Sequence, residues 1–169
     1  TPGISSAASD VYKRQQIQDP FLSAIIVGKY HRAMELKTEL ALDPESWMSN
    51  IGHSSRSEKI VTILGNLLEN ALEASASSGE QKKVCLSMTD VGNELIFEVE
   101  DSGSGISEDQ QKSIFDEGFT TKTGTGRGIG LQLVQKNLIQ LEGHLTVGES
   151  SLGGARFTAY IPKTVSKEE

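Results

Sequence analysis

The chain has 169 residues, and its 16 Lys and Arg against 23 Asp and Glu give a net charge of −7. This acidic balance argues against a nucleic-acid partner, whose phosphates need a basic surface, and the single cysteine excludes an internal disulfide framework. No apolar run approaches the roughly 20 residues needed to span a bilayer, so we expect no direct membrane contact by this piece.

The N-terminal part divides at about residue 16. Residues 1–15 are small and polar with no helical or strand period, which indicates a disordered leader or a non-native extension. Apolar residues at helical spacing then predict a helix that begins at Pro20 and ends near Leu36. The later predicted elements are, in order, a strand over 39–42, a helix over 57–76, strands over 84–88 and 95–99, a short helix over 107–115, a helix over 129–141, and strands over 145–147 and 156–161.

Three local signals mark the ends of these elements. Ser57 is expected to cap the helix over 57–76, Gly92-Asn93 to form the turn of a hairpin, and Gly143 to stop the helix before it. Strands and helices in this order predict an α+β fold in two layers, with a mixed sheet and helices on one face.

Two asparagines share one face of the predicted helix over 57–76. Asn66 and Asn70 are four residues apart, so their side chains project one turn apart. Two such amides are able to hold Mg²⁺ or phosphate oxygens, because Mg²⁺ takes one or two protein oxygens and completes its shell with water and phosphate. Taken alone, the two amides fit a plainer interpretation better, in which they hydrogen-bond to a neighbouring loop.

A carboxylate, Asp101, directly follows an apolar strand and precedes Gly103 and Gly105. A carboxylate at a strand end accepts a hydrogen bond from an exocyclic amine, and the glycines let the backbone approach a flat ring closely. On this motif alone, an ordinary turn built from Asp and Gly is the preferred explanation.

Alternating glycines run into the predicted helix over 129–141. They give a loop whose amides are able to turn toward phosphates, and the helix N-terminus adds free N–H groups and a partial positive charge. Lys122 and Arg127 supply cationic side chains. A flexible linker is the alternative, but a linker seldom leads straight into a strongly apolar helix. The glycines are Gly124, Gly126, Gly128 and Gly130.

Other nucleotide-binding motifs are absent from the sequence. No G-x-x-x-x-G-K-[ST] loop occurs, the glycines do not fit G-x-G-x-x-G, and neither H-R-D nor D-F-G occurs. These absences exclude a P-loop nucleotidase, a Rossmann fingerprint and a eukaryotic-type protein kinase.

Five motifs in one order resemble the ATP-binding domain of bacterial sensor histidine kinases, in the GHKL superfamily of gyrase, heat-shock chaperone, kinase and mismatch-repair ATPases. They are the N box NLLENALEA, the G1 box DSGSGI, the F box IFDEGF, the G2 box GTGRGIGL and the last strand GGARFTAYIP. The resemblance covers residues 17–163 and implies a two-layer α/β sandwich of the GHKL, or Bergerat, type. Three stretches resemble the citrate and four-carbon-dicarboxylate sensor subgroup: DPFLSAIIVGKYHRAMEL, GFTTK and RGIGLQLVQ.

The resemblance implies that ATP and Mg²⁺ bind here, with Asn70 as the metal ligand and Asn66 as a catalytic residue one turn before it. Asp101 matches the carboxylate that binds the adenine amine, and Lys122 lies where a second catalytic residue reaches the phosphates from the ATP lid. The further nucleotide contacts that it implies are Gly103, Gly105, Ile106, Gly126, Gly128, Ile129, Gly130, Leu131 and Thr158, and the lid anchors are Phe115 and Phe119.

Two positions depart from the wider pattern. Hydrolytic members of the superfamily carry a glutamate at the position of Asn66, and an amide cannot take a proton from water near neutrality. This favours ATP binding for phosphoryl transfer over intrinsic hydrolysis. Many sensor kinases carry a basic residue where this chain has Glu73, which leaves more of the phosphate charge to Mg²⁺, Lys122 and Arg127.

The resemblance also implies a division into domains and a set of partners. Residues 16–36 are expected to be a remnant of a dimerisation-hairpin helix, 37–164 the catalytic domain and 165–169 a tail. The implied activity is donation of the γ-phosphate of Mg-ATP to a histidine on that hairpin, in a two-component signalling kinase. The implied partners are the hairpin, a response regulator and a second copy of the full protein, in a cytoplasmic domain of a membrane-anchored bacterial sensor.

None of the three histidines has the context of a phosphate acceptor: they are His31, His53 and His144. We therefore expect a chain that binds ATP and does not phosphorylate itself. Two alternatives stay open. One is a serine kinase of the anti-sigma type on the same fold, which the expected hairpin remnant argues against. The other is a degenerate member that serves only for docking or dimerisation.

Overall fold

The computed structural model describes residues 16–79, 81–113 and 127–163. Five strands form one sheet in the order β1-β2-β3-β5-β4. Only β1 and β2 are parallel, and the other neighbours pair antiparallel. The strands are β1 (Glu39–Leu42), β2 (Lys83–Thr89), β3 (Glu94–Asp101), β4 (His144–Glu149) and β5 (Ala155–Pro162).

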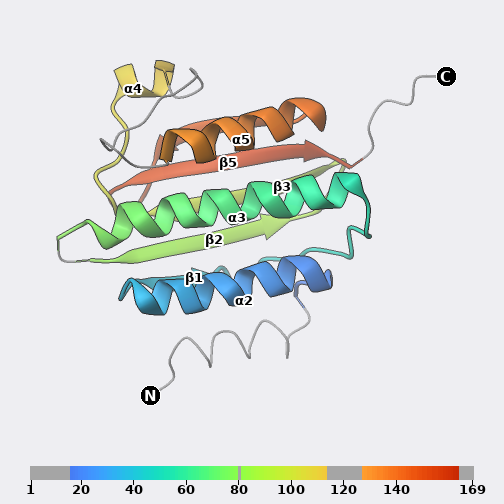
Figure 1. Cartoon of the computed structure of the whole chain (residues 1–169), viewed down its shortest axis with the longest axis horizontal. Coiled ribbons are helices and arrows are strands. Elements are labelled where there is room, and N and C mark those ends of the chain that lie inside the picture. The colour runs from blue at the N-terminus through green and yellow to red at the C-terminus, as the bar shows by residue number, and fades with distance from the viewer. Residues whose placement is uncertain (1–15, 80, 114–126, 164–169) are drawn as a thin grey trace.

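The long helices form a second layer on one face of this sheet (Figure 1). They are α2 (Pro20–Glu35), α3 (Ser55–Ala76) and α5 (Arg127–Gln140), while the short α4 (Glu108–Ser113) follows β3. The predicted α+β fold in two layers is thereby confirmed. In the described part of the chain, no helix is both long enough and apolar enough to cross a bilayer.

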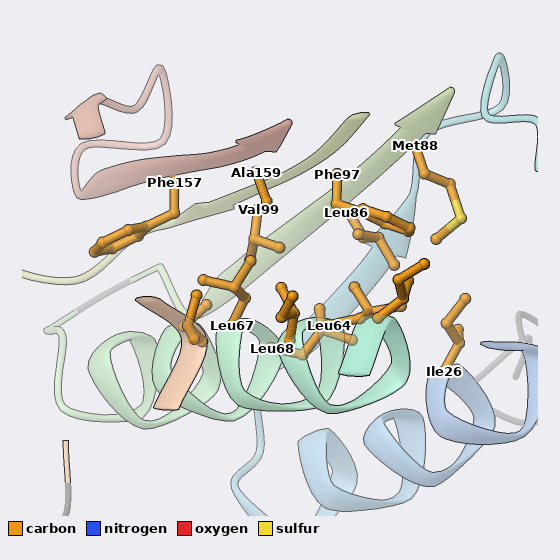
Figure 2. Close-up of a cluster of buried hydrophobic side chains, with 14 of the residues drawn as sticks. Ile26, Leu64, Leu67, Leu68, Leu86, Met88, Phe97, Val99, Phe157 and Ala159 are labelled. Atoms are coloured by element: carbon orange, nitrogen blue, oxygen red, sulfur yellow. The ribbon is translucent and has the colours of Figure 1, made fainter. Parts of the chain in front are cut away.

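The core lies between α3 and the sheet. Apolar side chains that recur every 3.6 residues along the helix pack there against apolar side chains that recur every second residue along the strands. Leu64, Leu67 and Leu68 of α3 point toward side chains that alternate along the strands, among them Phe97 and Phe157 (Figure 2). All five side chains are at most 1% exposed. Truncating one such leucine to alanine typically costs about 2–5 kcal/mol, because the cavity that it leaves does not collapse fully.

Helix α2 belongs to the same core. Its buried face includes Leu22, Ile26 and Tyr30, each at most 1% exposed, and Ile26 lies beside the leucines of α3 (Figure 2). On the half-buried side, Lys29 and Arg32 pair with Glu69 of α3 at 2.9 and 3.0 Å. Residues 20–35 therefore complete the layer of helices on this face of the sheet.

Helices α2 and α3 both begin with a residue whose side chain caps the first turn. Asp19 caps α2, because its Oδ1 accepts from the N–H groups of Phe21 and Leu22 at 2.9 Å. The start of α3 lies earlier than predicted: Ser54 is the N-cap, and Ser57 is the third helical residue, whose hydroxyl accepts from the N–H of Ser54 in a capping box.

The end of α5 depends on Gly143 for a different reason from the one expected. The left-handed residue is Glu142, with φ of 60°, and not the glycine. A Cβ on Gly143 would lie 2.4 Å from the carbonyl oxygen of Tyr160 on β5. Glycine is needed here because the chain leaves the helix directly against a strand, so no side chain fits.

Candidate functional site

Asn70 presents a buried amide that is not hydrogen-bonded within the described chain. Its side chain lies on α3 and the residue is 6% exposed. Neither Oδ1 nor Nδ2 has a hydrogen-bond partner among the residues that the structure describes. Buried polar groups are nearly always hydrogen-bonded, and leaving one without a partner costs about 1–3 kcal/mol. An amide in this position is therefore suited to a ligand.

Asn66, one turn before Asn70, is already partly engaged. Its Nδ2 donates to the carbonyl oxygen of Thr62 at 2.8 Å, which orients the amide along α3. Its Oδ1 lies 3.4 Å from the position that a Cβ on Gly130 would take, so it faces the first turn of α5. The expected common face of Asn66 and Asn70 is found, but only Asn70 combines full burial with a lack of partners among the described residues.

Asp101 is the last residue of β3 and is 1% exposed. Its Oδ1 accepts from the N–H groups of Gly103 at 2.9 Å and Ala155 at 3.1 Å. Its backbone oxygen accepts from the N–H of Gly154 at 3.0 Å. The carboxylate is therefore held in one orientation by the turn that follows β3 and by the start of β5.

Gly154 is a residue of this site that sequence reasoning missed. A Cβ at this position would lie 2.1 Å from Asp101 Oδ1 and 2.5 Å from the N–H nitrogen of Gly103. The backbone of the β4–β5 turn passes too close to the carboxylate for any side chain. The signal in the sequence is the Gly153-Gly154 pair directly before the last strand.

The turn after Asp101 rests on α3. A Cβ on Gly103 would lie 2.9 Å from both the Cβ and the carbonyl oxygen of Ala74, so the backbone approaches the helix closely. Gly105 has φ of 76°, a left-handed conformation that favours glycine, and Ile106 is 7% exposed. Ala74 lies one turn beyond Asn70, which brings the Asp101 turn to the face of α3 that carries the asparagine.

A cavity of about 630 Å³ borders this turn. Gly105 and Ile106 line one side of it, and Gly153 and Gly154 line the other. Neither Asn70 nor Asp101 belongs to its lining, so the cavity adjoins the site without containing its polar groups.

Helix α5 carries the described end of the glycine motif. It begins at Arg127, so the backbones of Gly128, Ile129 and Gly130 lie in its first turn. Gly130 faces Asn66, and Leu131 is 4% exposed in the core. The first N–H groups of a helix have no partner within it, which gives this end of α5 donors next to α3. Of the predicted positions, Lys122, Gly126, Phe115 and Phe119 lie outside the described residues.

The structure separates Thr158 from this group. On β5, Phe157 and Ala159 point toward the helices (Figure 2), so Thr158 between them points to the opposite face of the sheet. Its hydroxyl lies 3.4 Å from a carboxylate oxygen of Glu98 on β3, also on that face. Thr158 therefore does not share a surface with Asn70 and Asp101, and we leave it out of the site.

The described histidines also lie away from the site. His31 is exposed on α2, His53 stacks on Phe21 with ring centroids 4.9 Å apart, and His144 stacks on Tyr160 at 4.7 Å. In the residues that the structure covers, no three His, Cys, Asp or Glu side chains are grouped as a metal site would require.

The chain matches the model of a protein family over residues 55–165, described as histidine kinase-, DNA gyrase B- and HSP90-like ATPase. It is 46% identical over 155 residues to the sensor protein CitS of Halalkalibacterium halodurans. It is 37% identical to the sensor histidine kinase CitA of Klebsiella pneumoniae and 34% to a probable C4-dicarboxylate sensor kinase of H. halodurans. These matches cover 91%, 89% and 88% of the chain.

The chain spans less than a third of these relatives, since the matched parts make up 29%, 28% and 28% of their lengths. Among solved structures, it is similar to the nucleotide-free catalytic domain of the histidine kinase ThkA. That match has a TM-score of 0.70 at 26% identity and covers 85% of this chain and 91% of ThkA's domain. The chain therefore belongs to the family of histidine kinase-, DNA gyrase B- and HSP90-like ATPases, as the ATP-binding catalytic domain of a two-component sensor histidine kinase.

Proposed function

We propose that this domain binds ATP together with Mg²⁺ and donates the γ-phosphate to a histidine on a dimerisation hairpin elsewhere in the full protein. The observation that carries the proposal is the buried amide of Asn70, which has no hydrogen-bond partner in the described chain. It lies one turn from the place where the Asp101 turn rests on α3. Membership of an ATPase family supplies the identity of the nucleotide.

The roles follow from the chemistry of each group. The amide oxygen of Asn70 is a neutral hard ligand of the kind Mg²⁺ accepts alongside water and phosphate oxygens. Bound Mg²⁺ would neutralise charge on the phosphates. The Asp101 carboxylate, already oriented by Gly103 and Ala155, is an acceptor for the exocyclic amine of adenine. The N–H groups at the start of α5 are donors for phosphate oxygens, and Lys122 and Arg127 are the cations that we assign to the lid.

Asn66 favours transfer of the phosphoryl group over its loss to water. In the transfer, an imidazole nitrogen of the acceptor forms a bond to the γ-phosphorus while the bond from that phosphorus to the β,γ-bridging oxygen breaks, and ADP leaves. A carboxylate at position 66 would be able to accept a proton from water, whereas the amide of Asn66 is not a base near neutral pH. Its Nδ2 is held by Thr62, so the oxygen stays directed toward α5.

The acceptor histidine has to come from another segment. His31, His53 and His144 lie on α2, before α3 and on β4, and two of them stack on aromatic rings. The hairpin, a homodimer of the full protein, a response regulator that receives the phosphoryl group, and a membrane anchor for the cytoplasmic domain are parts of the same proposal. They come from the similarity to sensor kinases that are more than three times as long as the matched part.

Calorimetric titration of the chain with ATP and Mg²⁺ tests the binding step. We expect saturable heat with the wild-type chain. In Asp101→Asn the affinity should fall by about tenfold or more, because the amide side chain no longer offers a charged acceptor to the amine. The matched control is Asp43→Asn, which changes an acidic residue on the loop after β1. Absence of ATP binding by the wild-type chain would refute the proposal.

A further inference from the structure

Two serine hydroxyls join α3, the start of β2 and the turn that carries Asp101. Ser75 lies on α3 and is fully buried, and Ser102 directly follows Asp101 and is 8% exposed. The hydroxyl of Ser75 accepts from the N–H of Ser102 at 3.0 Å and donates to the carbonyl oxygen of Lys83 at 3.0 Å. It therefore bridges the turn to β2 from the helix side.

The hydroxyl of Ser102 makes the reciprocal connection. It donates to the carbonyl oxygen of Gln81 at 2.7 Å and accepts from the N–H of Lys83 at 2.9 Å. Both the backbone N–H and the side chain of Ser102 are thus bound, and the residue next to Asp101 has little freedom to rotate. These hydrogen bonds are partly or wholly buried, where a satisfied network holds a unique geometry.

The position of the Asp101 carboxylate depends on this turn. Gly103, one residue beyond Ser102, donates its N–H to Asp101 Oδ1 at 2.9 Å, so a shift of the turn shifts the carboxylate. The turn is seated on Ala74, the residue before Ser75, where an added Cβ on Gly103 would come within 2.9 Å. One segment of α3 therefore carries Asn70 and, a turn later, holds the backbone that orients Asp101.

We propose that Ser75 and Ser102 are positioning residues. They hold the Asp101 carboxylate in the position and orientation needed to accept a hydrogen bond from a purine amine. This inference rests on the proposed function, because it gives these residues a part in the selectivity of the ATP site. Both hydroxyls are bound to backbone groups, and both act through the backbone on either side of Asp101.

The Ser75→Ala variant should fold. The carbonyl oxygen of Lys83 keeps the N–H of Ser102 as a donor at 3.1 Å, and that N–H keeps its acceptor, so neither backbone group is left without a partner. Ser102→Ala is the second variant, and Ser102→Thr retains the hydroxyl. Ser77→Ala is the matched control, since it removes a hydroxyl from the exposed end of the same helix, 3.2 Å from the carbonyl oxygen of Glu73.

The test compares the affinity for ATP with that for inosine triphosphate, which has a carbonyl oxygen in place of the amine, by calorimetry in the presence of Mg²⁺. We expect Ser75→Ala and Ser102→Ala to lower ATP affinity by about three- to tenfold and to leave inosine triphosphate affinity unchanged, since the hydrogen bond from the adenine amine to the Asp101 carboxylate is weakened and not lost. The preference for ATP therefore shrinks. Ser102→Thr and Ser77→Ala should keep the wild-type preference, and adding Ser75→Ala to Asp101→Asn should cause no further loss.

A purely structural role would lower both affinities equally, since a general loosening does not distinguish an amine from a carbonyl oxygen. An unchanged ratio of the two affinities in both alanine variants would overturn this inference alone, provided that the wild-type chain prefers ATP. A wild-type chain that binds neither nucleotide would overturn the proposed function and this inference with it. A wild-type chain that binds both nucleotides equally would overturn this inference and the assignment of Asp101 to the adenine amine, but not ATP binding itself.

Discussion

Asn70 is the residue at which the stability and the function of this domain oppose each other. A buried amide that has no hydrogen-bond partner among the described residues destabilises the free protein and becomes useful when a ligand reaches it. Sites of this kind trade stability for activity, so replacing the polar group by an apolar one of similar size should make the nucleotide-free protein more stable.

Asn70→Leu tests this trade. We expect the free energy of unfolding without nucleotide to rise by about 1 kcal/mol, because an unsatisfied donor and acceptor leave the interior. Binding of Mg-ATP should be lost in the same variant. Urea unfolding monitored by circular dichroism gives the first quantity and calorimetry gives the second. A loss of stability in Asn70→Leu would instead indicate that the amide has a structural partner, and would contradict its role as a ligand-binding group.

Gly154 is the residue whose substitution should damage the site most directly. An alanine there places its Cβ 2.1 Å from Asp101 Oδ1, so the turn has to move. We expect Gly154→Ala to lower the free energy of unfolding by about 1–3 kcal/mol, which is typical of overpacking. The matched control is Gly28→Ala on α2, where nothing lies within 4 Å of the added Cβ. The free energy of unfolding of that variant should be higher than that of the wild-type chain by about 0.4–1 kcal/mol. Equal melting temperatures for the two variants would contradict the described geometry.

Among the elements, α2 and α3 are joined by one carboxylate with two cations. The Glu69 carboxylate forms salt bridges with Lys29 at 2.9 Å and with Arg32 at 3.0 Å. Burial alone would raise the pKa of Glu69, but the hydrogen bonds and charges of Lys29 and Arg32 outweigh it and hold this pKa below its ordinary value. A lowered folded-state pKa contributes stability above the unfolded pKa of about 4.3 and loses it as pH falls through the folded value.

The consequence is a pH-dependent effect of Glu69→Gln. At pH 7 the variant should be less stable than the wild-type chain by up to about 1 kcal/mol, a modest amount because the pair is partly exposed. The difference should shrink as the pH falls below the unfolded pKa of about 4.3 and through the lowered folded-state pKa, where Glu69 becomes protonated in the wild-type chain as well. Thermal melts at pH 7 and pH 3.5 measure it. Glu35→Gln, which removes the more exposed partner of Arg32, is the control and should change little at either pH. A difference as large at pH 3.5 as at pH 7 would rule out the electrostatic explanation.

The sequence predicted elements where capping and periodicity agree and missed details that depend on tertiary contacts. Asp19-Pro20 located the start of α2 because both residues act locally. The start of α3 was misplaced, since Ser54 and Ser57 are equally good caps by composition and only the capping box distinguishes them. Gly143 was identified for the wrong reason, because its close approach to Tyr160 follows from the pairing of β4 with β5, which places His144 opposite Tyr160.

In the candidate site, too, the sequence predicted what depends on local spacing and missed what depends on tertiary contacts. The four-residue spacing of Asn66 and Asn70 predicted a common face, but not that only Asn70 lacks a hydrogen-bond partner among the described residues. Strand alternation would have excluded Thr158, since the apolar Phe157 beside it already marks the buried face. The close approach of the Gly154 backbone to Asp101 brings together residues that are far apart in sequence, and local patterns carry no information about such contacts.

At the scale of the whole molecule, α2 packs into the core that α3 shares with the sheet. Its apolar stripe was visible in the sequence, but a stripe does not tell which surface it covers. Since the stripe packs against α3, the helix gives no argument against a serine kinase of the anti-sigma type. The preference for a histidine kinase rests instead on the relatives.

A chain that begins at residue 37 tests the role of α2. Leu22, Ile26 and Tyr30 are fully buried, and each such side chain contributes about 1.5–3 kcal/mol, against a total stability of about 5–15 kcal/mol for a typical domain. We therefore expect the shortened chain to lose its cooperative thermal transition by circular dichroism. A sharp transition near that of the full chain would instead support the predicted domain boundary at residue 36.

The most direct test of the central claim is the Mg²⁺ dependence of ATP affinity in the wild-type chain and in Asn70→Ala, measured by calorimetry with Mg²⁺ and with EDTA. We predict that ATP affinity in the wild-type chain falls when Mg²⁺ is removed, and that Asn70→Ala binds ATP equally weakly under both conditions while its circular dichroism spectrum is unchanged. A folded Asn70→Ala variant that keeps the full Mg²⁺ dependence of the wild-type chain would contradict the assignment of Asn70 as the metal ligand.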